Sequence, residues 1–287
     1  MSDFEVPLEN PDNQCYLNTI LKCLANHREI VDVTLNKFDS ITGNNTNGGL
    51  LIYFAKMIIK HYGQDLVPET FEYLRRYFAE EFFQLMNQRT DHFNKVEQQD
   101  ANEMFIIIIN HFEEIFDNIS TNSQERNIVS TIFDALVRQE IKCDFSDDCR
   151  HSNIETNRGF YLSINSDRIN SIKQALDIHL QPVHFTGSNQ YNCETHGLQS
   201  AVQTKTFSRL PSSLMLVLMR FMTIGDLTTK ITKKIFIQQK LTLSQVIMYD
   251  GMIPFQDTNT VKYRLKSLCL HIGNDTKSGH YIGISLI

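Results

Sequence analysis

Residues 10–25 read NPDNQCYLNTILKCLA and contain the most informative cysteine of the chain. The apolar residues recur every three or four positions, which predicts a helix over residues 15–25 preceded by a polar turn. Cys15 would begin that helix, where free backbone amides and the macrodipole favour a thiolate, the form of cysteine that attacks acyl groups. The alternative is an ordinary buried cysteine, a description that fits Cys23, eight residues further on.

The composition predicts a folded, water-soluble protein of one large domain or two small ones. The chain has 287 residues, a net charge of −6, 41% hydrophobic residues and 21% charged residues. No apolar run in the sequence approaches the roughly 20 residues that a membrane-spanning helix needs. The sequence pI near 5.9 argues against a general nucleic-acid binder.

The six cysteines are interpreted as free thiols, available for catalysis or for metal binding. An even number could form three disulfides, but a chain of this length needs no covalent staples. Residues 1–5 include acids and no base, so we expect no signal peptide. A reducing compartment follows, and we expect an intracellular protein of the cytoplasm, the nucleus or both.

Helical patterns fill the first half of the chain and strand patterns fill the second. We expect helices over residues 15–25, 50–61 and 97–116, and a further helical stretch after Pro68. Alternating or β-branched runs predict strands, interrupted by one helix over 172–179, at residues 137–142, 160–164, 198–207, 214–221, 230–237, 263–271 and 281–286. This order predicts an α+β fold rather than alternating α/β, in a single folded unit.

His280, in the tripeptide Gly279-His280-Tyr281, is the best candidate for a base that activates a cysteine. It lies at a predicted junction between loop and strand, where a side chain can project into a cleft, and Gly279 permits a sharp turn there. The chain has ten histidines, and a single histidine is more often a surface or structural residue. Taken alone, the tripeptide is therefore a weak signal.

Five motifs lie in order along nearly the whole chain. They are NPDNQCYLNT at residues 10–19, QQDANE at 98–103, Leu210-Pro211, LMRF at 218–221, and a C-terminal group of YRL at 263–265, HIG at 271–273 and GHY at 279–281. In this combination the sequence resembles the ubiquitin-specific protease family, because each motif has a counterpart in that family's signatures. Any one of them would be weak by itself.

The resemblance implies a papain-like cysteine peptidase with a helical thumb, an antiparallel β palm and β fingers. One catalytic domain would fill residues 1–287, with the thumb over 1–135, the fingers over 136–210 and the palm over 211–287. The implied activity is that of a thiol-dependent deubiquitinase, which hydrolyses the peptide or isopeptide bond after the C-terminal glycine of ubiquitin. The implied partners are ubiquitin or ubiquitinated proteins, and we expect a monomer with no nucleic acid, membrane or organic cofactor.

The resemblance also assigns catalytic roles. Cys15 would attack the carbonyl of the ubiquitin C-terminal glycine, and His280 would take the thiol proton and later serve the leaving amine and the water step. Asn10 matches the family's asparagine that stabilises the oxyanion. Without the resemblance, Asn10 would be interpreted as a turn residue before Pro11.

Four further matched residues would bind the substrate. Asp100 and Glu103, three positions apart on one helical face, would lie along the cleft that holds the basic tail of ubiquitin. They could equally be an acid pair that stabilises the start of a helix. His271 and Tyr281 would line the same cleft, although His271 could also be a strand residue with no special task.

The sequence departs from the family in three places within or after the motifs that would carry catalysis. Asp12 stands where the family has glycine, Gln14 stands where it has threonine, and the charge of Asp12 would disfavour a nearby thiolate. The sequence ends at Ile287, without the family's following segment, its tryptophan, and the Asp or Asn that orients the histidine. We therefore expect a shortened chain, a Cys–His dyad, or a protein that no longer turns over.

These departures keep two other functions open. One is a catalytically impaired ubiquitin-binding module of the same fold. The other is a peptidase for a different ubiquitin-like modifier or for peptides.

Cys143, Cys149, Cys193 and His196 are the candidate ligands of one structural zinc ion, since thiolate and imidazole are the donors that zinc prefers. Cys193 and His196 form a C-x2-H knuckle where the resembling family has Cys-x-x-Cys. Cys143 and Cys149 have five residues between them rather than two, and His151 could replace one of the cysteines as a ligand. If the metal site has decayed instead, these residues would be free thiols.

Overall fold

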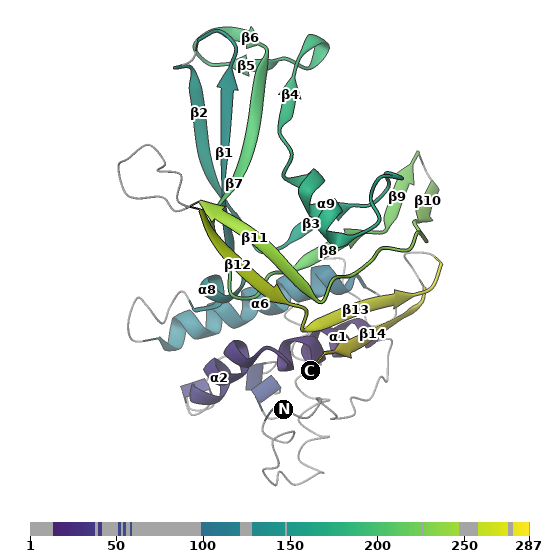
Figure 1. The fold of residues 1–287 in the computed structure, drawn as a ribbon. Helices are drawn as coiled ribbons and strands as arrows, with labels where there is room; N and C mark the ends of the chain where they lie inside the picture. The colour runs from purple at the N-terminus through teal and green to yellow at the C-terminus, as the bar shows by residue number, and fades with distance from the viewer. Residues whose placement is uncertain are drawn as a thin grey trace, which may run out of the picture. The chain divides into compact units, whose positions relative to one another are not determined.

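The computed structural model describes residues 14–37, 40–41, 51–52, 54–55, 58, 99–120, 128–146, 148–225, 227–246, 258–274 and 278–286 (Figure 1). They divide into two compact units. The first unit combines the chain up to Ile132 with Phe221–Lys230 and Leu265–Ile287. The second combines Phe133–Arg220 with Ile231–Arg264. None of the helices in these ranges is long and apolar enough to span a membrane.

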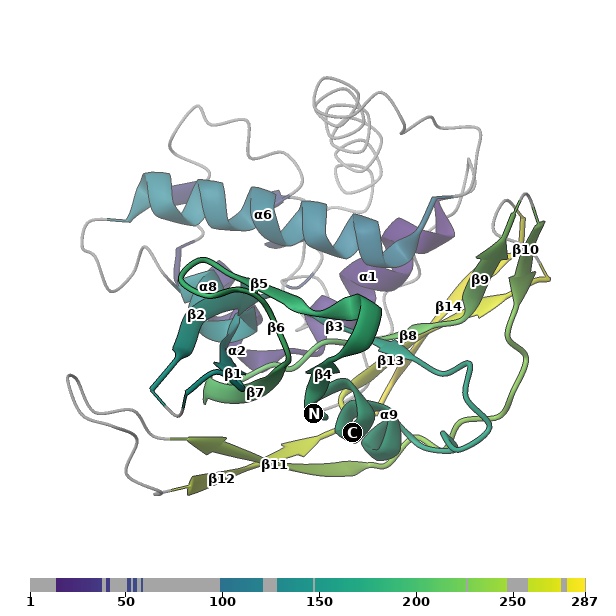
Figure 2. The same ribbon diagram turned by 90° about the horizontal axis from the view of Figure 1, so that it is seen from above.

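Helices α1 (Cys15–Ala25), α2 (Arg28–Asn36) and α6 (Ala101–Ile119) form the helical part of the first unit. Helix α8 (Ile128–Phe133) ends at its border with the second unit. α1 packs against α2 and α6 (Figure 2). The inward face of α6 includes the fully buried Phe112 and Phe116, and the Phe112 ring centroid lies 5.4 Å from that of Phe54. α6 therefore contributes buried aromatic rings to the core of the first unit, together with buried aliphatic residues such as Ile108 and Ile109.

Two β-hairpins complete the first unit. β9 (Phe221–Ile224) pairs with β10 (Leu227–Lys230), and β13 (Ser267–Ile272) pairs with β14 (His280–Ser285), both antiparallel. β13 and β14 pack on α1, as Figure 1 shows. The C-terminal hairpin therefore lies against the N-terminal helix.

A four-stranded antiparallel sheet dominates the second unit, in the order β2-β1-β7-β4. Its strands are β1 (Ala135–Cys143), β2 (Arg150–Asn157), β4 (Val183–Phe185) and β7 (Ala201–Arg209). Between β4 and β7 the chain forms the short 3-10 helix η1 (Gly187–Asn189) and a small hairpin of β5 (Tyr191–Cys193) and β6 (Gly197–Gln199).

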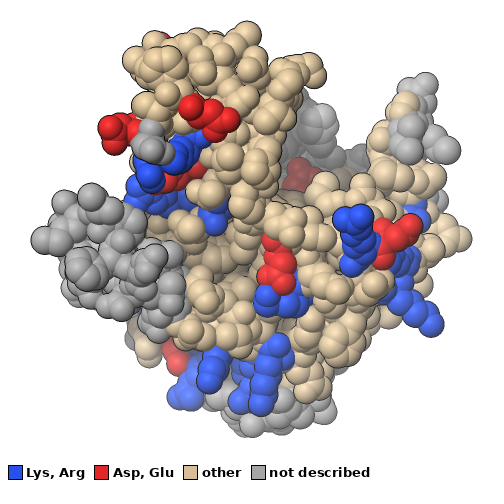
Figure 3. All heavy atoms as spheres, turned by 45° about the horizontal axis from the view of Figure 1, so that its top comes forward, with Lys and Arg blue, Asp and Glu red and all other residues tan. Residues whose placement is uncertain are grey.

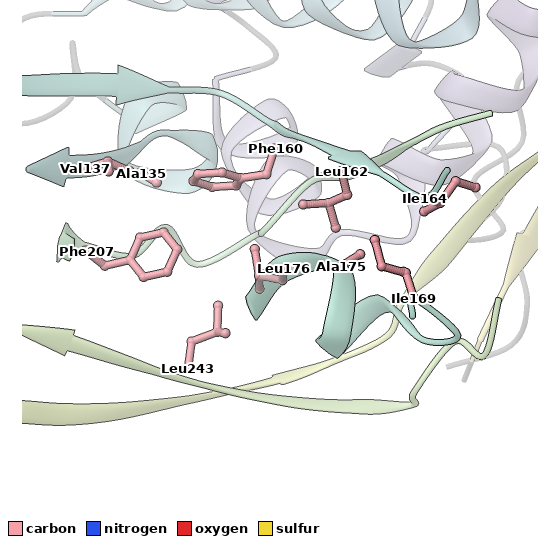
Figure 4. Packing of buried hydrophobic residues seen from close by; sticks show 10 residues of the cluster. All are labelled: Ala135, Val137, Phe160, Leu162, Ile164, Ile169, Ala175, Leu176, Phe207 and Leu243. Carbon is pink, nitrogen blue, oxygen red and sulfur yellow. The ribbon is translucent and has the colours of Figure 1, made fainter. Parts of the chain in front are cut away.

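The rest of the second unit is two strand pairs and one helix. β3 (Phe160–Ser163) pairs in parallel with β8 (Leu216–Met219), and β11 (Lys240–Val246) pairs antiparallel with β12 (Thr258–Arg264). Helix α9 (Ile172–His179) lies over a core in which the Phe160 and Phe207 rings meet edge to face at 5.5 Å (Figure 4). Leu162, Leu176 and Leu243 also belong to this core.

The charged side chains on the face shown in Figure 3 lie in small groups of mixed sign over a largely uncharged surface.

Several sequence predictions are confirmed. The helices expected over residues 15–25 and 172–179 are α1 and α9. The helix expected over 97–116 begins at Ala101, because Asp100 caps it. The strands expected over 137–142, 160–164 and 281–286 are β1, β3 and β14, within one or two residues. Residues 51–52, 54–55 and 58 are helical, as expected, and the stretch after Pro68 lies outside the described residues.

The strand predicted over residues 230–237 is wrong. β10 ends at Lys230, and beyond it only Phe236 forms an isolated bridge, to Ser171. The guanidinium of Arg220 donates to the carbonyls of Ile231 and Lys233, at 3.1 and 2.9 Å. The Arg220 side chain thus provides hydrogen bonds to backbone carbonyls that would otherwise need the N–H groups of a neighbouring strand. The segment can therefore remain outside a sheet.

Three other predicted strands are each divided in two. Residues 263–271 contain the end of β12 and the start of β13, which belong to different hairpins. Residues 198–207 are split between β6 and β7, and residues 214–221 between β8 and β9. β2 was not predicted, because its sequence RHSNIETN is polar and mostly exposed and so lacks the alternation that marks a strand.

Candidate functional site

Cys15 is the first residue of α1, and only 5% of its surface is exposed. Its sulfur accepts a hydrogen bond from the backbone N–H of Tyr281, with the two atoms 3.4 Å apart. Buried Gln14 precedes the helix, and its carbonyl accepts the N–H of Asn18 at 3.0 Å. The thiol predicted as nucleophile therefore lies beside the backbone of β14, one residue from His280.

Three contacts fix β14 and its partner strand to α1. Asn26, at the C-terminal end of α1, donates to the Ser285 hydroxyl at 2.5 Å and to the Lys22 carbonyl at 2.8 Å. The hydroxyl of Ser267 donates to the Cys23 carbonyl at 3.4 Å. At Gly283 the strand passes so close to α1 that an added Cβ would lie 3.4 Å from the Thr19 methyl carbon. A methyl group at residue 283 would therefore contact α1, and a larger side chain would find little room there.

The turn before His280 depends on glycine. Gly279 has φ of +149°, and an added Cβ there would collide with the carbonyl of Ile272 and with the Nε2 atom of His271. Gly273, on the opposite side of the hairpin, has φ of +148°, and a Cβ there would lie 2.7 Å from the Ser278 carbonyl. His280 begins β14 opposite Ile272, and its side chain is exposed.

Tyr281 pairs with His271 across the hairpin, and their ring centroids lie 4.8 Å apart. Burial raises the pKa of the Tyr281 phenol, and the negative charge of Asp100 raises it further. Tyr281 is therefore a neutral phenol at physiological pH, and it lies close enough to the start of α6 to sense Asp100.

Asp100 is the N-cap of α6. Its carboxylate accepts from the N–H groups of Asn102, at 2.7 Å, and Glu103, at 3.0 Å. This geometry confirms the prediction of an acidic helix start. Glu103 lies in the first turn with an exposed side chain. Thus Cys15, Asp100, His271, His280 and Tyr281 all belong to the first unit, whereas Asn10 lies outside the described residues.

Lys230 was not singled out in the sequence, yet its Nζ atom lies 3.0 Å from Nδ1 of His271. A lysine at the end of the threonine-rich strand Leu227–Lys230 carries no local signal of such a role. The contact between Lys230 and His271 becomes visible only in the structure, where the β9–β10 hairpin and the β13–β14 hairpin belong to the same unit.

A second cluster lies in the second unit, where Cys143, Cys149, His151 and Cys193 bring their donor atoms within 4.8 Å of one another. Cys143 ends β1, His151 lies near the start of β2, and Cys193 ends β5. The loop after Cys143 folds back, so that the Cys143 N–H donates to the Cys149 carbonyl at 3.0 Å. The longer spacing between these two cysteines therefore does not prevent them from meeting.

The distances fit a tetrahedral metal. With zinc–sulfur and zinc–nitrogen bonds of about 2.3 and 2.0 Å, tetrahedral ligands would lie about 3.4 to 3.8 Å apart. The Cys149 and Cys193 sulfurs are 3.7 Å apart, and Nε2 of His151 lies 3.8 and 3.3 Å from them. A disulfide would need about 2.05 Å, and all six cysteines are free.

His196 supplies a fifth donor. Its Nδ1 atom lies 3.4 Å from the Cys149 sulfur and 3.6 Å from that of Cys193. Its ring stacks on Phe145 with centroids 3.9 Å apart. Two histidines therefore compete for the position that three thiolates would leave on a tetrahedral ion.

Two cysteines of the cluster differ strongly in the pKa of their thiols. Burial raises the pKa of Cys193. Hydrogen bonds from the amides of Thr195 and His196 and from the rings of His196 and His151 outweigh that effect and lower the pKa to about 5. Burial, followed by the neighbouring thiols, raises the pKa of Cys143 to about 12. The cluster therefore combines a thiolate at Cys193 with a thiol at Cys143 that a divalent cation would deprotonate as it binds.

Comparison with known proteins identifies the relatives of this chain. The family model described as ubiquitin carboxyl-terminal hydrolase matches residues 6–286. Ubiquitin carboxyl-terminal hydrolase 9 of Saccharomyces cerevisiae is 27% identical over 214 residues, which cover 71% of this chain and 28% of that protein. The probable ubiquitin carboxyl-terminal hydrolase 16 of Schizosaccharomyces pombe is 24% identical, over 96% of this chain and 58% of that protein.

Among solved structures, the SAGA Ubp8/Sgf11/Sus1/Sgf73 DUB module bound to ubiquitin aldehyde contains a similar chain. The TM-score is 0.79 at 21% identity, over 99% of this chain and 62% of that chain. This likeness confirms the predicted α+β, papain-like fold with thumb, palm and fingers. The chain spans less than two thirds of the length of each of these relatives.

Proposed function

Since the chain belongs to the ubiquitin carboxyl-terminal hydrolase family, we propose that it is a cysteine deubiquitinase. It hydrolyses the peptide or isopeptide bond after the C-terminal glycine of ubiquitin. Its partners are ubiquitin or ubiquitinated proteins, a proposal supported by the relatives' names and by the ubiquitin aldehyde bound to the similar DUB module. The observation that carries the proposal is the hydrogen bond from the Tyr281 N–H to the Cys15 sulfur, which joins the cysteine helix to the strand that His280 begins.

The chemistry follows from these residues. His280 takes the proton of the Cys15 thiol, and the sulfur attacks the glycine carbonyl to form a tetrahedral oxyanion. When that intermediate collapses, the C–N bond breaks and His280 protonates the leaving amine. His280 then deprotonates a water that hydrolyses the thioester, which restores the thiol. Asn10 is proposed as the amide donor to the oxyanion.

The remaining site residues are proposed to bind ubiquitin's basic C-terminal tail. Asp100 and Glu103 supply negative charge at the start of α6, and His271 and Tyr281 line the cleft beside Cys15. The Asp100 carboxylate already accepts two backbone N–H groups, so its position is set before any substrate arrives.

A structural zinc ion is proposed for the cluster in the second unit. Cys143, Cys149 and Cys193 would hold it, with His196 or His151 as the fourth ligand, and all four positions would be filled by protein. The ion would tie the loop after β1 to the β5–β6 hairpin and would take no part in the hydrolysis.

Two features of the proposal concern the molecule as a whole. The thumb would span residues 1–135, the fingers 136–210 and the palm 211–287, in a monomer. The free thiols are compatible with a reducing, intracellular location, in the cytoplasm or the nucleus. Sedimentation of the purified chain and imaging of a tagged chain in its own cell would test these two expectations.

A ubiquitin probe with a C-terminal electrophile, such as ubiquitin vinyl sulfone, tests the proposed activity. We expect covalent labelling of the wild type, loss of labelling in Cys15→Ala, and retention in the control Cys23→Ala. Ubiquitin binding without labelling would instead indicate an impaired binding module. Labelling only by the probe of another modifier would indicate a different substrate class, and neither binding nor labelling would refute the assignment.

A further inference from the structure

The ammonium group of Lys230 is surrounded by acceptors from one neighbouring strand and the turn that follows it. It lies 3.0 Å from Nδ1 of His271, and it donates to the carbonyls of His271 at 2.9 Å and Gly273 at 2.6 Å. The three contacts match the three hydrogens of an ammonium group. Lys230 is half-buried, and its Nζ atom lies 5.7 Å from the centroid of the Phe221 ring. This lysine is therefore held in place rather than solvated.

The contact with Nδ1 determines where the imidazole of His271 carries its proton. An ammonium group can only donate, so Nδ1 must accept, and the neutral ring then carries its hydrogen on Nε2. A second positive charge on the ring would lie against the ammonium and would be disfavoured. His271 is thus kept neutral, as the Nε2–H tautomer.

The orientation of the His271 ring in turn defines the turn before His280. A Cβ added to Gly279 would collide with His271 Nε2 and would lie 2.9 Å from its Cε1 atom, so the Gly279 backbone rests on the edge of the imidazole. The Tyr281 and Phe221 rings lie on other sides of it, with centroids 4.8 and 5.8 Å away. The imidazole is therefore packed closely against Gly279, the residue before His280.

We propose that Lys230 is a positioning residue for the catalytic histidine. It fixes the tautomer and orientation of His271, His271 supports the backbone at Gly279, and Gly279 presents His280 beside Cys15. This inference rests on the proposed function for its catalytic readout, but its structural core does not require ubiquitin. A lysine that only closed the hairpin through the two carbonyls would leave the His271 tautomer unconstrained.

Nitrogen-15 NMR of histidine-labelled full-length protein at pH 7 tests the core of the proposal directly. We expect the His271 resonances of the wild type to report a neutral ring with its proton on Nε2. The opposite tautomer or a protonated ring in the wild type would overturn the proposal, and this measurement does not depend on whether any variant folds.

Variants test the link to catalysis. Lys230→Met keeps the apolar stem and removes the ammonium group, Lys230→Arg keeps the charge and donors, and Lys234→Met changes an exposed lysine as control. In Lys230→Met we expect loss of the single tautomer, slower alkylation of Cys15 by iodoacetamide, and about a tenfold fall in kcat on a ubiquitin fluorogenic substrate, with KM little changed. Lys230→Arg should retain part of the tautomer preference, of the Cys15 alkylation rate and of kcat. Lys234→Met should resemble the wild type in all three.

The readouts separate the possible failures. If Lys230→Met folds and keeps the His271 tautomer and the Cys15 alkylation rate, Lys230 is not a positioning residue, whatever happens to kcat. If the wild type cleaves no ubiquitin substrate while the tautomer and alkylation effects appear as expected, the proposed substrate fails and the positioning role stands.

Discussion

The backbone amide of Tyr281 donates to the sulfur of Cys15 across 3.4 Å, although the two residues are 266 positions apart in the chain. The contact places the first residue of α1 against the second residue of β14. A buried sulfur thereby lies next to the strand whose first residue is His280. The predictions that follow test this arrangement, its supports, and the separate metal cluster.

His280→Gln should reduce kcat on a ubiquitin fluorogenic substrate by about 10²- to 10⁴-fold, because that is the usual contribution of a general acid–base group. The exposed His184 in β4 offers a control, and His184→Gln should keep wild-type kinetics. Steady-state kinetics at saturating substrate provides the measurement. Equal activity in the two variants would remove His280 from the mechanism.

Gly279→Ala should be destabilising and inactive. The new Cβ would meet the Ile272 carbonyl and the His271 ring, in a backbone conformation that side chains rarely adopt. We expect a loss of about 1 to 3 kcal/mol in the free energy of unfolding. Urea titration followed by circular dichroism measures it.

Gly187→Ala is the matched control for that substitution. Gly187 has φ of +62°, and nothing lies within 4 Å of its added Cβ, so only backbone strain of about 1 kcal/mol should appear. Activity should be retained. If the two variants were equally stable and equally active, the close packing at Gly279 would have no functional consequence.

Two substitutions of Asp100 separate its structural and electrostatic roles. Asp100→Ala removes the cap of α6 and should cost about 1 kcal/mol, whereas Asp100→Asn keeps a capping oxygen and should be nearly neutral in stability. If the charge also attracts the basic tail of ubiquitin, Asp100→Asn should raise KM without changing the unfolding free energy. An unchanged KM would leave Asp100 as a helix cap alone.

One histidine of the cluster should dominate metal binding. His151 belongs to the group whose donor atoms all lie within 4.8 Å, so His151→Ala should weaken the affinity for Co²⁺ more than His196→Ala does. Replacing Zn²⁺ by Co²⁺ and titrating with a competing chelator gives the affinity, and the visible bands report the number of thiolate ligands. The reverse order would assign the fourth position to His196, and the absence of binding in the wild type would indicate a decayed site.

His27 should make the first unit sensitive to acid. Burial, with the nearby charge of Lys266, lowers the pKa of His27 from 6.5 to about 4. Between these values the unfolded chain binds a proton that the folded chain does not, so stability falls as the pH drops from about 6.5 towards 4. The contribution lost is about 2 to 3 kcal/mol.

The test compares the pH dependence of the unfolding free energy in the wild type and in His27→Gln, from urea titrations between pH 7.5 and pH 4.5. The variant should show a shallower decline, because glutamine does not titrate. Parallel curves would show that His27 is equally protonated in the folded and unfolded states. The difference between the curves is the informative quantity, since carboxylates titrate in both proteins.

Local patterns predicted the elements whose partners matter little. α1 and α9 follow from the spacing of apolar residues, and the start of α6 follows from the acids at its N-terminus. The strands were harder, because a strand is defined by its partner. The run 263–271 looks continuous in sequence, yet Tyr263 pairs with Leu241 and His271 pairs with Tyr281.

The metal cluster was also predicted only in part from the sequence. Composition and spacing were enough to select three cysteines and two histidines, since few other roles bring such donors together. Spacing favoured His196 and offered His151 as a replacement for a cysteine, whereas in the structure both rings lie near the Cys149 sulfur, His151 at 3.8 Å and His196 at 3.4 Å.

The sequence alone proposed Cys15 and His280 as nucleophile and base, from their residue types and the family motifs around them, and these roles remain predictions. Only the tertiary structure revealed the contact between Tyr281 and Cys15, the packing of His271 against Gly279, and the hydrogen bond between Lys230 and the His271 imidazole. The first and the last of these relations join segments far apart in the chain. They depend on which hairpins pack together, and that is decided by burial and backbone hydrogen bonding over the whole unit rather than by any local pattern.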